Sequence, residues 1–229
     1  MDRLIDITSL FTFNRLGNII RRVPSTHHRS VMQQAIASTR DFQFISGSLA
    51  LDFVNTVGNR LGEARDYFST PRDVFRWVAL PGCLPHLGHI NIRRSDMTGI
   101  RNRREYLYEM FLPFARRTKR EGPHLLAKLN HDIAQLWSKK TLRHEGGRIQ
   151  WVFEGSGAEQ IAHAIVSDAA DLLCSGRCEL IRQCQGGSCG WLYLDRSREK
   201  NRRWCSMRDC GNRAKAHRFY TRHHKEGEA

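Results

Sequence analysis

Six of the seven cysteines of this 229-residue chain lie between positions 174 and 210. Four of them form two pairs of equal spacing, Cys184-x4-Cys189 and Cys205-x4-Cys210, with fifteen residues between the pairs. Two cysteine pairs on tight turns can form a tetrahedral zinc site, in which four thiolate sulfurs surround one ion at about 2.3 Å. Four protein ligands leave no open position for a substrate. We therefore expect one structural Zn2+ per chain and no catalytic metal.

Other uses of these cysteines are less favoured. Disulfide frames are typical of small secreted domains, whereas these cysteines cluster in a basic chain in which we find no secretory signal. Redox pairs of the thioredoxin kind have two residues between their cysteines, not four. Cys174 and Cys178 end a predicted helix and are expected to pack as small hydrophobes, and Cys83 lies in a predicted loop. A mixed ligand set stays open, with these additional candidates: Cys178, His217, His223 and His224.

The positive charge of the chain is concentrated near its C-terminal end. The formal charge is +14, and residues 196–225 contribute +9, from eleven basic and two acidic residues. Dense cations favour a polyanionic partner, because each phosphate they neutralise releases condensed counterions. We predict that this segment binds a polyanion such as nucleic acid. The candidate contact residues are Arg196, Arg198, Arg202, Arg203, Arg208, Asn212, Arg213, Lys215, Arg218 and Arg222.

Two of these candidates have competing interpretations. Asn212 and Arg213 have side chains that can read adenine and guanine edges bidentately. Asn212 can equally cap a helix or donate to a ligand sulfur. Arg213 can instead pair with Asp195 or Asp209.

The segment that must position the four cysteines has the composition of a small zinc finger, which we place at residues 179–225. Residues 191–194 are strand-like, and residues 214–222 have helical composition. A turn with two ligands, a hairpin, and a helix whose first turn brings the last ligand make a treble-clef-like arrangement. Its expected core residues are Trp191, Tyr193, Trp204, Met207 and Phe219.

Residues 41–178 are expected to form an α+β domain that is mainly helical and contains one β-hairpin. Helical faces are predicted over residues 49–57, 123–138 and 157–174, and Gly146-Gly147 separates two strand-like runs over residues 141–153. Thr70-Pro71-Arg72-Asp73 is a strong helix start, because it combines a capping hydroxyl, an initial proline and an early carboxylate. The buried stripe of that helix is expected to be Val74, Trp77 and Val78.

Several side chains of this domain carry individual predictions. Phe42 and Phe44 alternate as in a strand, and residues 81–94 are predicted to be a loop. Ser95 is expected to cap a helix that Pro113 kinks or ends. Its inward residues would be Ile100, Leu107, Met110, Phe111 and Phe114, and its outward residues Arg101, Arg103 and Arg104. The inward residues of the helix over 123–138 would be Leu126, Leu129, Ile133 and Leu136.

Residues 1–40 are predicted to be a disordered leader, or a segment preceding a true start at Met32. No apolar run in the chain approaches the roughly 20 residues that cross a bilayer, which excludes a membrane-spanning protein. We expect a cytoplasmic, nucleoid-associated protein.

No motif for catalysis is found. The sequence shows no nucleophile with its base, no phosphate-binding loop and no His-Glu metal motif, so we expect no catalytic residues and no enzyme. Asp195 and Ser197 have no accompanying base. Asp52 and Asn55 lie near the apolar face of a helix, where capping or an interhelical hydrogen bond is favoured over lining a pocket.

Five blocks in order resemble the CGNR zinc-finger family. They are Cys184-x4-Cys189-Gly190-Trp191, Asp195-Arg196-Ser197, residues 202–207, Cys210-Gly211-Asn212-Arg213 and Lys215. Residues 44–56 are similar to the opening of the ABATE domain, which usually precedes that finger. The resemblance covers about residues 41–225. It implies the metal ligands Cys184, Cys189, Cys205 and Cys210, a finger that binds DNA, and a role as a stress-induced transcription regulator.

The sequence thus favours a zinc-binding transcription regulator whose N-terminal domain senses a small-molecule effector or forms a homodimer. The alternative is a zinc-stabilised module that binds protein or RNA without reading a DNA sequence. A third hypothesis, an enzyme in residues 41–178, has no identifiable chemistry.

Overall fold

The computed structural model describes residues 11–13, 19–21, 42–80, 83–84, 90–118 and 122–226. Of the predicted leader it describes β1 (Phe11–Phe13) and β2 (Ile19–Arg21), which pair antiparallel. The rest of that prediction, and part of the predicted loop over 81–94, lie outside the described residues.

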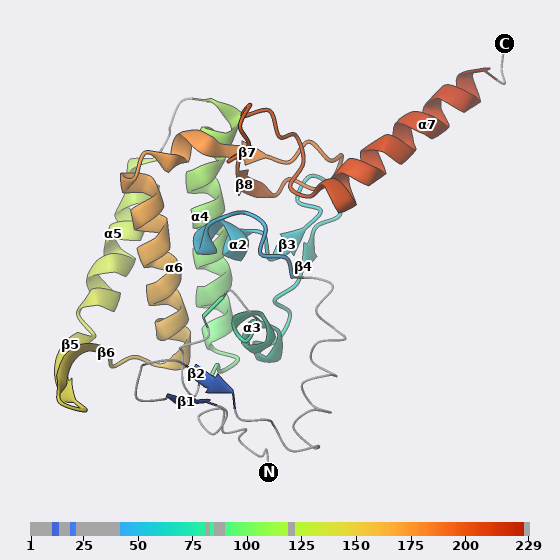
Figure 1. The fold of residues 1–229 in the computed structure, drawn as a ribbon. Coiled ribbons are helices and arrows are strands. Elements are labelled where there is room, and N and C mark those ends of the chain that lie inside the picture. Colours follow the sequence, from blue (N-terminus) through green and yellow to red (C-terminus); the bar gives the residue numbers. More distant parts are fainter. Residues whose placement is uncertain are drawn as a thin grey trace.

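Three long helices form the frame of the molecule (Figure 1): α4 (Asp96–Arg116), α5 (Pro123–Trp137) and α6 (Gly157–Cys174). The short helix α2 (Leu49–Val54) packs against α4 and α6, and α3 (Pro71–Val78) follows it in the chain. The prediction of a mainly helical α+β body is confirmed.

Small antiparallel sheets connect these helices. They are β3 (Val57–Gly58) with β4 (Arg65–Asp66), β5 (Lys140–Glu145) with β6 (Arg148–Phe153), and β7 (Ile181–Gln183) with β8 (Leu192–Leu194). The chain continues from α6 through the 3-10 turn η3 (Arg177–Leu180), and after β8 through the π-turn η4 (Met207–Gly211). The final helix, α7 (Asn212–Glu226), projects away from the body (Figure 1).

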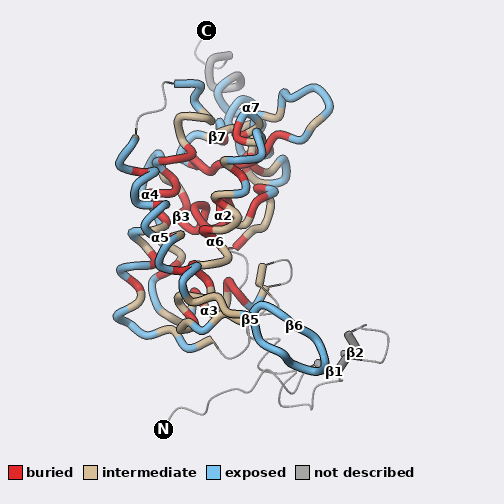
Figure 2. The backbone as a smooth tube through the Cα atoms, turned by 90° about the vertical axis from the view of Figure 1, so that its left-hand side faces the viewer, coloured by how far each residue is buried: buried red, intermediate tan, exposed pale blue. Residues whose placement is uncertain are grey.

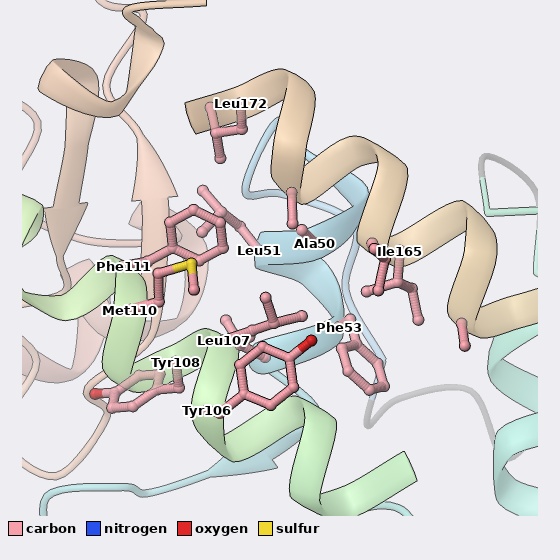
Figure 3. Packing of buried hydrophobic residues seen from close by; sticks show 14 of the residues in the cluster. Ala50, Leu51, Phe53, Tyr106, Leu107, Tyr108, Met110, Phe111, Ile165 and Leu172 are labelled. Carbon is pink, nitrogen blue, oxygen red and sulfur yellow. The ribbon is translucent and has the colours of Figure 1, made fainter. Parts of the chain in front are cut away.

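The main hydrophobic core lies where α2, α4 and α6 meet. Leu51 of α2, Phe111 of α4 and Ile165 of α6 are fully buried in it (Figure 3). The same cluster includes Ile181 and Leu192, from the hairpin that bears the first cysteine pair. Figure 2 shows the buried backbone running through the upper half of the body to β7. The first half of the zinc finger is therefore built into the core of the helical body.

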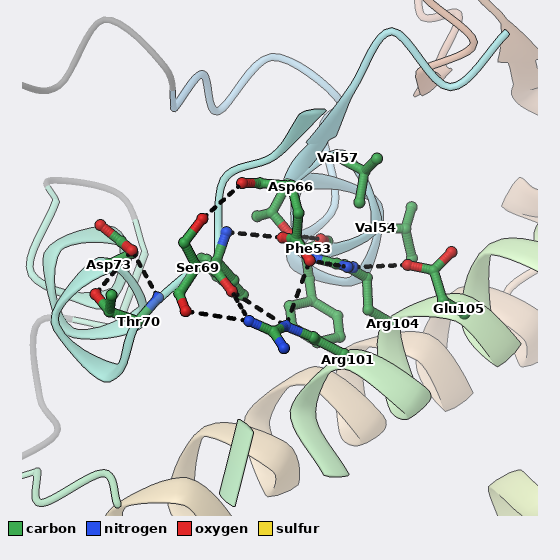
Figure 4. Close-up of polar contacts among 12 residues, drawn as sticks. Phe53, Val54, Val57, Asp66, Ser69, Thr70, Asp73, Arg101, Arg104 and Glu105 are labelled. Atoms are coloured by element: carbon green, nitrogen blue, oxygen red, sulfur yellow. Dashed lines mark hydrogen bonds and ion pairs between the residues drawn. The ribbon is translucent and has the colours of Figure 1, made fainter. Parts of the chain in front are cut away.

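Local sequence signals placed several elements correctly. Helix α3 begins at Pro71, and the Thr70 N–H and hydroxyl both donate to the Asp73 carboxylate at 2.8 Å (Figure 4). The predicted stripe of Val74, Trp77 and Val78 is buried. Helices α5 and α6 and the β5–β6 hairpin, with its turn at Gly146-Gly147, also lie where they were predicted. These elements depend on capping, turn chemistry and periodicity, all of which are local properties.

The prediction that three α4 arginines point outward is wrong. Arg104 is only 3 % exposed and donates to both carboxylate oxygens of Asp66, at 2.7 and 2.9 Å (Figure 4). Arg103 forms an equally bidentate pair with Asp132, at 2.7 and 2.8 Å, and Arg101 donates to the Phe68 carbonyl. Burial opposes ionisation of Asp66, but the Arg104 guanidinium outweighs it and lowers the pKa of Asp66. Helix α4 has neighbours on several sides, so Arg103 and Arg104 are paired with carboxylates of those neighbours.

Other side-chain predictions are also corrected. Phe42 and Phe44 form no strand; Phe42 packs edge-on against Phe68, and Phe44 stacks on Trp77 with ring centroids 5.6 Å apart. Helix α4 continues through Pro113 to Arg116, and Ser95 makes no side-chain cap. Leu126 is half-exposed on the outer side of α5. Each error concerns a position whose environment depends on which neighbour the fold supplies.

None of the helices in the described ranges combines the length and apolar composition needed to cross a bilayer.

Candidate metal centre and basic surface

The four predicted cysteines come together at one point. Cys184 and Cys189 lie at the tip of the β7–β8 hairpin, Cys205 follows an irregular loop, and Cys210 lies in η4 immediately before α7. The sequence predicts a hairpin after the first cysteine pair. In the structure, the two strands of the hairpin instead lie on either side of that pair, which forms its turn. Attachment of the last ligand to a helix start is the treble-clef-like arrangement that was expected.

The sulfur geometry fits one zinc ion. All four cysteines are buried, and their Sγ atoms lie within 4.8 Å of one another. The Sγ distances are 3.7 Å from Cys189 to Cys205 and 3.6 Å from Cys205 to Cys210. In a tetrahedron with zinc–sulfur bonds of about 2.3 Å, neighbouring sulfurs are roughly 3.8 Å apart. The prediction of a single structural zinc ion is confirmed.

Donors around the sulfurs support a set of thiolates. The backbone N–H groups of Cys205 and Gly186 donate to the Cys184 Sγ at 3.3 and 3.4 Å. The Arg213 guanidinium donates to the Cys210 Sγ at 3.3 Å. A Cβ at position 186 would lie 3.0 Å from the Cys210 Sγ, so a side chain there would crowd the ligand sulfur. Such contacts orient the ligands and offset the negative charge of a four-thiolate site.

The thiols also influence one another's ionisation. Hydrogen bonds from the neighbouring thiols lower the pKa of Cys184, while contact with Cys184 raises the pKa of Cys205. Four thiols in contact therefore cannot all lose their protons without a cation between them. Zinc supplies that charge in sites of this type.

The remaining ligand candidates lie elsewhere. Among the described residues, the four cysteines are the single group of His, Cys, Asp or Glu side chains with metal-holding geometry. Cys178 is buried in the main core, where its thiol contacts the Leu172 carbonyl, and Cys174 is exposed at the end of α6. Cys178 thus packs as expected, whereas Cys174 does not. His217 is exposed on α7, and the side chains of His223 and His224 lie outside the described part.

The zinc-bearing hairpin is fastened to the helical body by Asn55. Its side-chain amide donates to the Leu192 carbonyl at 2.8 Å, and its oxygen accepts from the Leu192 N–H at 2.9 Å. Asn55 therefore satisfies the outer edge of β8 as a neighbouring strand would. Asp52, one turn earlier, accepts from the backbone N–H groups of Ile45 and Ser46. Both residues position backbone, in agreement with the expectation that they do not line a pocket.

Further hydrogen bonds join the cysteine turn to the body. The Arg60 N–H donates to the Cys189 carbonyl at 3.1 Å, and the Tyr108 hydroxyl donates to the Gly190 carbonyl at 2.9 Å. The Trp191 indole donates to the Val57 carbonyl at 2.8 Å. Sequence reasoning missed Arg60 and Tyr108, because their role depends on segments far apart in the chain.

Six of the ten candidate nucleic-acid residues make contacts within the protein, and two of these, Arg198 with Glu199 and Arg218 with the Ala214 carbonyl, are local contacts at the surface. The Arg202 guanidinium stacks over the Tyr193 ring at 4.3 Å and donates to the carbonyls of Trp204 and Cys205. Arg213 donates to the Cys210 sulfur. In the described structure it does not form the alternative ion pair with Asp195 or Asp209. Arg196 donates to the Gly47 carbonyl, and Arg203 donates to Gln185.

Arg202 is half-buried, whereas Arg196, Arg203 and Arg213 are exposed in spite of their contacts, and so are the other described candidates. Arg198, Arg208, Asn212, Lys215 and Arg218 are exposed, and the side chain of Arg222 lies outside the described part. Met207 and Phe219 are also half or more exposed, which corrects their predicted place in the finger core. The core of the finger consists of Trp191, Tyr193, the cysteines and, at its edge, Trp204. Phe219 lies on α7, which projects away from the body (Figure 1), whereas Met207 lies in η4.

Asp195 is a structural residue. It is fully buried and accepts hydrogen bonds from the Ser197 N–H, the Ser197 hydroxyl and the Arg202 N–H. Burial opposes its ionisation, but these donors prevail and lower the pKa of Asp195. Its oxygens are occupied by the loop between the two cysteine pairs, so Asp195 shapes that loop.

Comparison with family models assigns the chain in two parts. Residues 47–176 match the ABATE family, described as "Putative stress-induced transcription regulator", and residues 181–223 match the CGNR zinc finger. No curated protein matches the chain.

Proposed function

Because the chain belongs to the ABATE family and carries a CGNR zinc finger, we propose that it is a transcription regulator that binds double-stranded DNA through this finger. The observation behind the proposal is that some basic residues contact the zinc core while others are exposed to solvent. Arg202 and the exposed Arg213 donate to groups of the zinc core, whereas Arg208, Lys215 and Arg218 are exposed on and beside α7 and make no described contact with that core. The function proposed is binding and not catalysis, because four protein ligands leave zinc no open position.

Helix α7 has the form of a groove-binding element. Its fifteen residues span roughly 22 Å at 1.5 Å per residue, and the major groove of B-DNA admits a helix. Asn212, Lys215 and Phe219 follow at i, i+3 and i+7 and so share one face. Since Arg213 is held by a ligand sulfur, we assign base contact to Asn212. Phosphate contact is assigned to these exposed cations: Arg196, Arg198, Arg203, Arg208, Lys215 and Arg218. It is assigned also to Arg222, which follows in the same helix.

The test is fluorescence anisotropy with zinc-loaded full-length protein and duplex DNA over a range of salt concentrations. Binding should weaken steeply with salt, and the double variant Arg208→Ala/Lys215→Ala should lower the salt slope by roughly 2. Lys128→Ala, which removes an exposed cation from α5, is the matched control and should change neither affinity nor slope. Absence of binding at low salt would refute the proposal.

Competition experiments address the alternative. Structured RNA, heparin and unlabelled duplex DNA each compete with the labelled duplex for the protein. Equal competition by all three would favour a module that binds polyanions or proteins without reading a DNA sequence. Preference for particular duplex sequences would favour the regulator.

We further propose that residues 41–178 sense an effector or dimerise, and that residues 179–225 act as the DNA-binding part in the cytoplasm, on the nucleoid. A cavity of about 680 Å³ between α4, α5 and α6 offers a place for a small effector. It is lined by both charges, including Arg93, Lys139, Asp96 and Glu159. Thermal-shift screening of small zwitterionic compounds tests this role. A compound that binds in the cavity should raise the melting temperature of the wild type but not that of Gly99→Trp, whose side chain fills the cavity.

A further inference from the structure

The β5–β6 hairpin has one apolar and one polar face. Its register pairs Leu142 with Trp151 and His144 with Ile149, so these side chains share a face. The opposite face carries one apolar residue, Val152, and otherwise polar and charged residues: Thr141, Arg143, Glu145, Arg148 and Gln150. Leu142, Ile149 and Trp151 are 58–72 % exposed. The hairpin stands off from the body as a loop of exposed backbone (Figure 2).

The apolar surface continues onto α5. The Lys140 ammonium lies over the rings of both Trp137 and Trp151, at 4.7 and 5.0 Å. Trp137 ends α5 and is half-exposed, and Leu126 lies eleven residues earlier, on the same helical stripe. We refer to Leu126, Trp137, Leu142, Ile149 and Trp151 as the hairpin surface. It contains five of the nine large hydrophobic side chains that are exposed among the described residues.

Such a surface is unusual for a protein that acts alone. Within the described residues, neither β5 nor β6 pairs with a third strand. An isolated two-stranded hairpin is only marginally stable in water, and contiguous exposed apolar residues mark interaction sites. The hairpin surface therefore requires a partner that covers it.

We propose that this partner is a second copy of the chain, packed through the same hairpin surface about a two-fold axis. Lys140 is the one fully charged side chain on the apolar face of the hairpin, and two tryptophan rings hold its ammonium. The face therefore offers little to nucleic acid or to an acidic protein. Identical apolar faces need no charge complement and satisfy the self-complementarity of an isologous dimer.

The size of the surface sets the strength of the dimer. Each of the five side chains exposes roughly 100 Å² of apolar area, so that a dimer buries roughly 1,000 Å² in all. Specific interfaces start near about 1,200 Å², and backbone at the rim adds to the side-chain area. An interface at the low end of the size range is typical of a reversible dimer.

The position of the hairpin is compatible with DNA binding. The hairpin and α7 lie at opposite ends of the molecule (Figure 1), so that pairing through the hairpin surface leaves both zinc fingers uncovered. Dimeric regulators commonly use two such modules on two half-sites. The inference rests on the dimerising role proposed above for residues 41–178, but not on DNA binding.

Sedimentation equilibrium of the zinc-loaded full-length protein without DNA, from about 1 to 200 µM, tests the inference. The wild type should reach a dimer, and Trp151→Lys should raise the dimer Kd by at least about tenfold. The matched control is Gln150→Lys, which adds the same charge to the same strand on the opposite face, and should dimerise as the wild type does.

Circular dichroism verifies that each variant is folded, and Ile149→Lys replaces Trp151→Lys if the latter is not. A wild type that stays monomeric at 200 µM would overturn the inference, and so would equal dimer Kd values for Trp151→Lys and the wild type. If residues 1–40 of the same chain cover the hairpin surface instead, the wild type stays monomeric at 200 µM. Unaltered salt-sensitive DNA binding by monomeric Trp151→Lys would separate this inference from the proposed function.

Discussion

Removal of the Asn55 side chain tests whether the zinc finger is part of the helical body. In Asn55→Ala, the N–H and C=O of Leu192 both lose their partner at a buried position. Each unsatisfied buried backbone group costs about 1–3 kcal/mol. Partial access of water reduces the sum, and we expect the free energy of unfolding to fall by about 2–4 kcal/mol.

The effect should extend to both halves of the protein. Leu192 belongs to the same core cluster as α2, α4 and α6, and the cysteine turn follows directly from its hairpin. Urea unfolding followed by far-UV circular dichroism should show one transition, shifted to lower urea. Release of zinc to a chromophoric chelator should accelerate in parallel, because metal binding is coupled to folding. Asn201→Ala, at an exposed position of the finger, is the matched control and should stay within about 0.5 kcal/mol of the wild type.

Two outcomes would refute this reasoning. Faster zinc release with an unchanged unfolding transition of the helices would show that the finger is an independent module. An unchanged stability together with unchanged zinc release would show that the Asn55 hydrogen bonds contribute nothing.

Three further predictions concern single side chains. Burial raises the pKa of Asp52 from 3.8 to about 6 despite the donors at Ile45 and Ser46, so the free energy of unfolding of the wild type should fall by at most about 3 kcal/mol as the pH rises from about 4 through 6. Asp52→Asn cannot titrate, so urea titrations should show its stability rising relative to the wild type by the same amount over this pH range. A stability difference between the two proteins that does not change with pH would contradict the raised pKa of Asp52. Arg104→Met removes the bidentate partner of the Asp66 carboxylate, which is 34 % exposed and keeps an ion pair with Arg101. Thermal unfolding should report a loss of about 2 kcal/mol, whereas substitution of exposed Arg72 should report almost none. Cys205→Ser should abolish stoichiometric zinc binding in metal analysis. It should also speed amide hydrogen exchange in the helical core, because β7 and β8 belong to that core. Amide exchange in α2 at the wild-type rate would count against a core shared by the finger and the helices.

Short-range signals in the sequence predicted a large part of the fold. The cysteine spacing located the zinc ligands, because two residues on one tight turn are brought together by the turn itself. Thr70-Pro71 located the start of α3, and Gly146-Gly147 located the turn of the β5–β6 hairpin. Each of these features depends on backbone conformation within a few residues.

The orientation of charged residues could not be predicted in this way. Helical composition placed Arg103 and Arg104 on an outer face, yet both are paired inward with Asp132 and Asp66. A buried arginine is stable only where the fold brings a carboxylate to it, and those carboxylates lie 29 and 38 positions away in the chain. In the finger, the same reasoning separates Arg202, which is turned inward, from Arg208, which is exposed.

The sequence by itself determined that the chain has a zinc finger with a basic surface and a mainly helical body. Only the tertiary structure decided that the finger is fastened to that body, through Asn55 on one side and Arg60 on the other. The reason is physical: an edge strand such as β8 exposes N–H donors and C=O acceptors that can pair with any suitable partner. Which partner satisfies them depends on segments that meet only after the whole chain has folded.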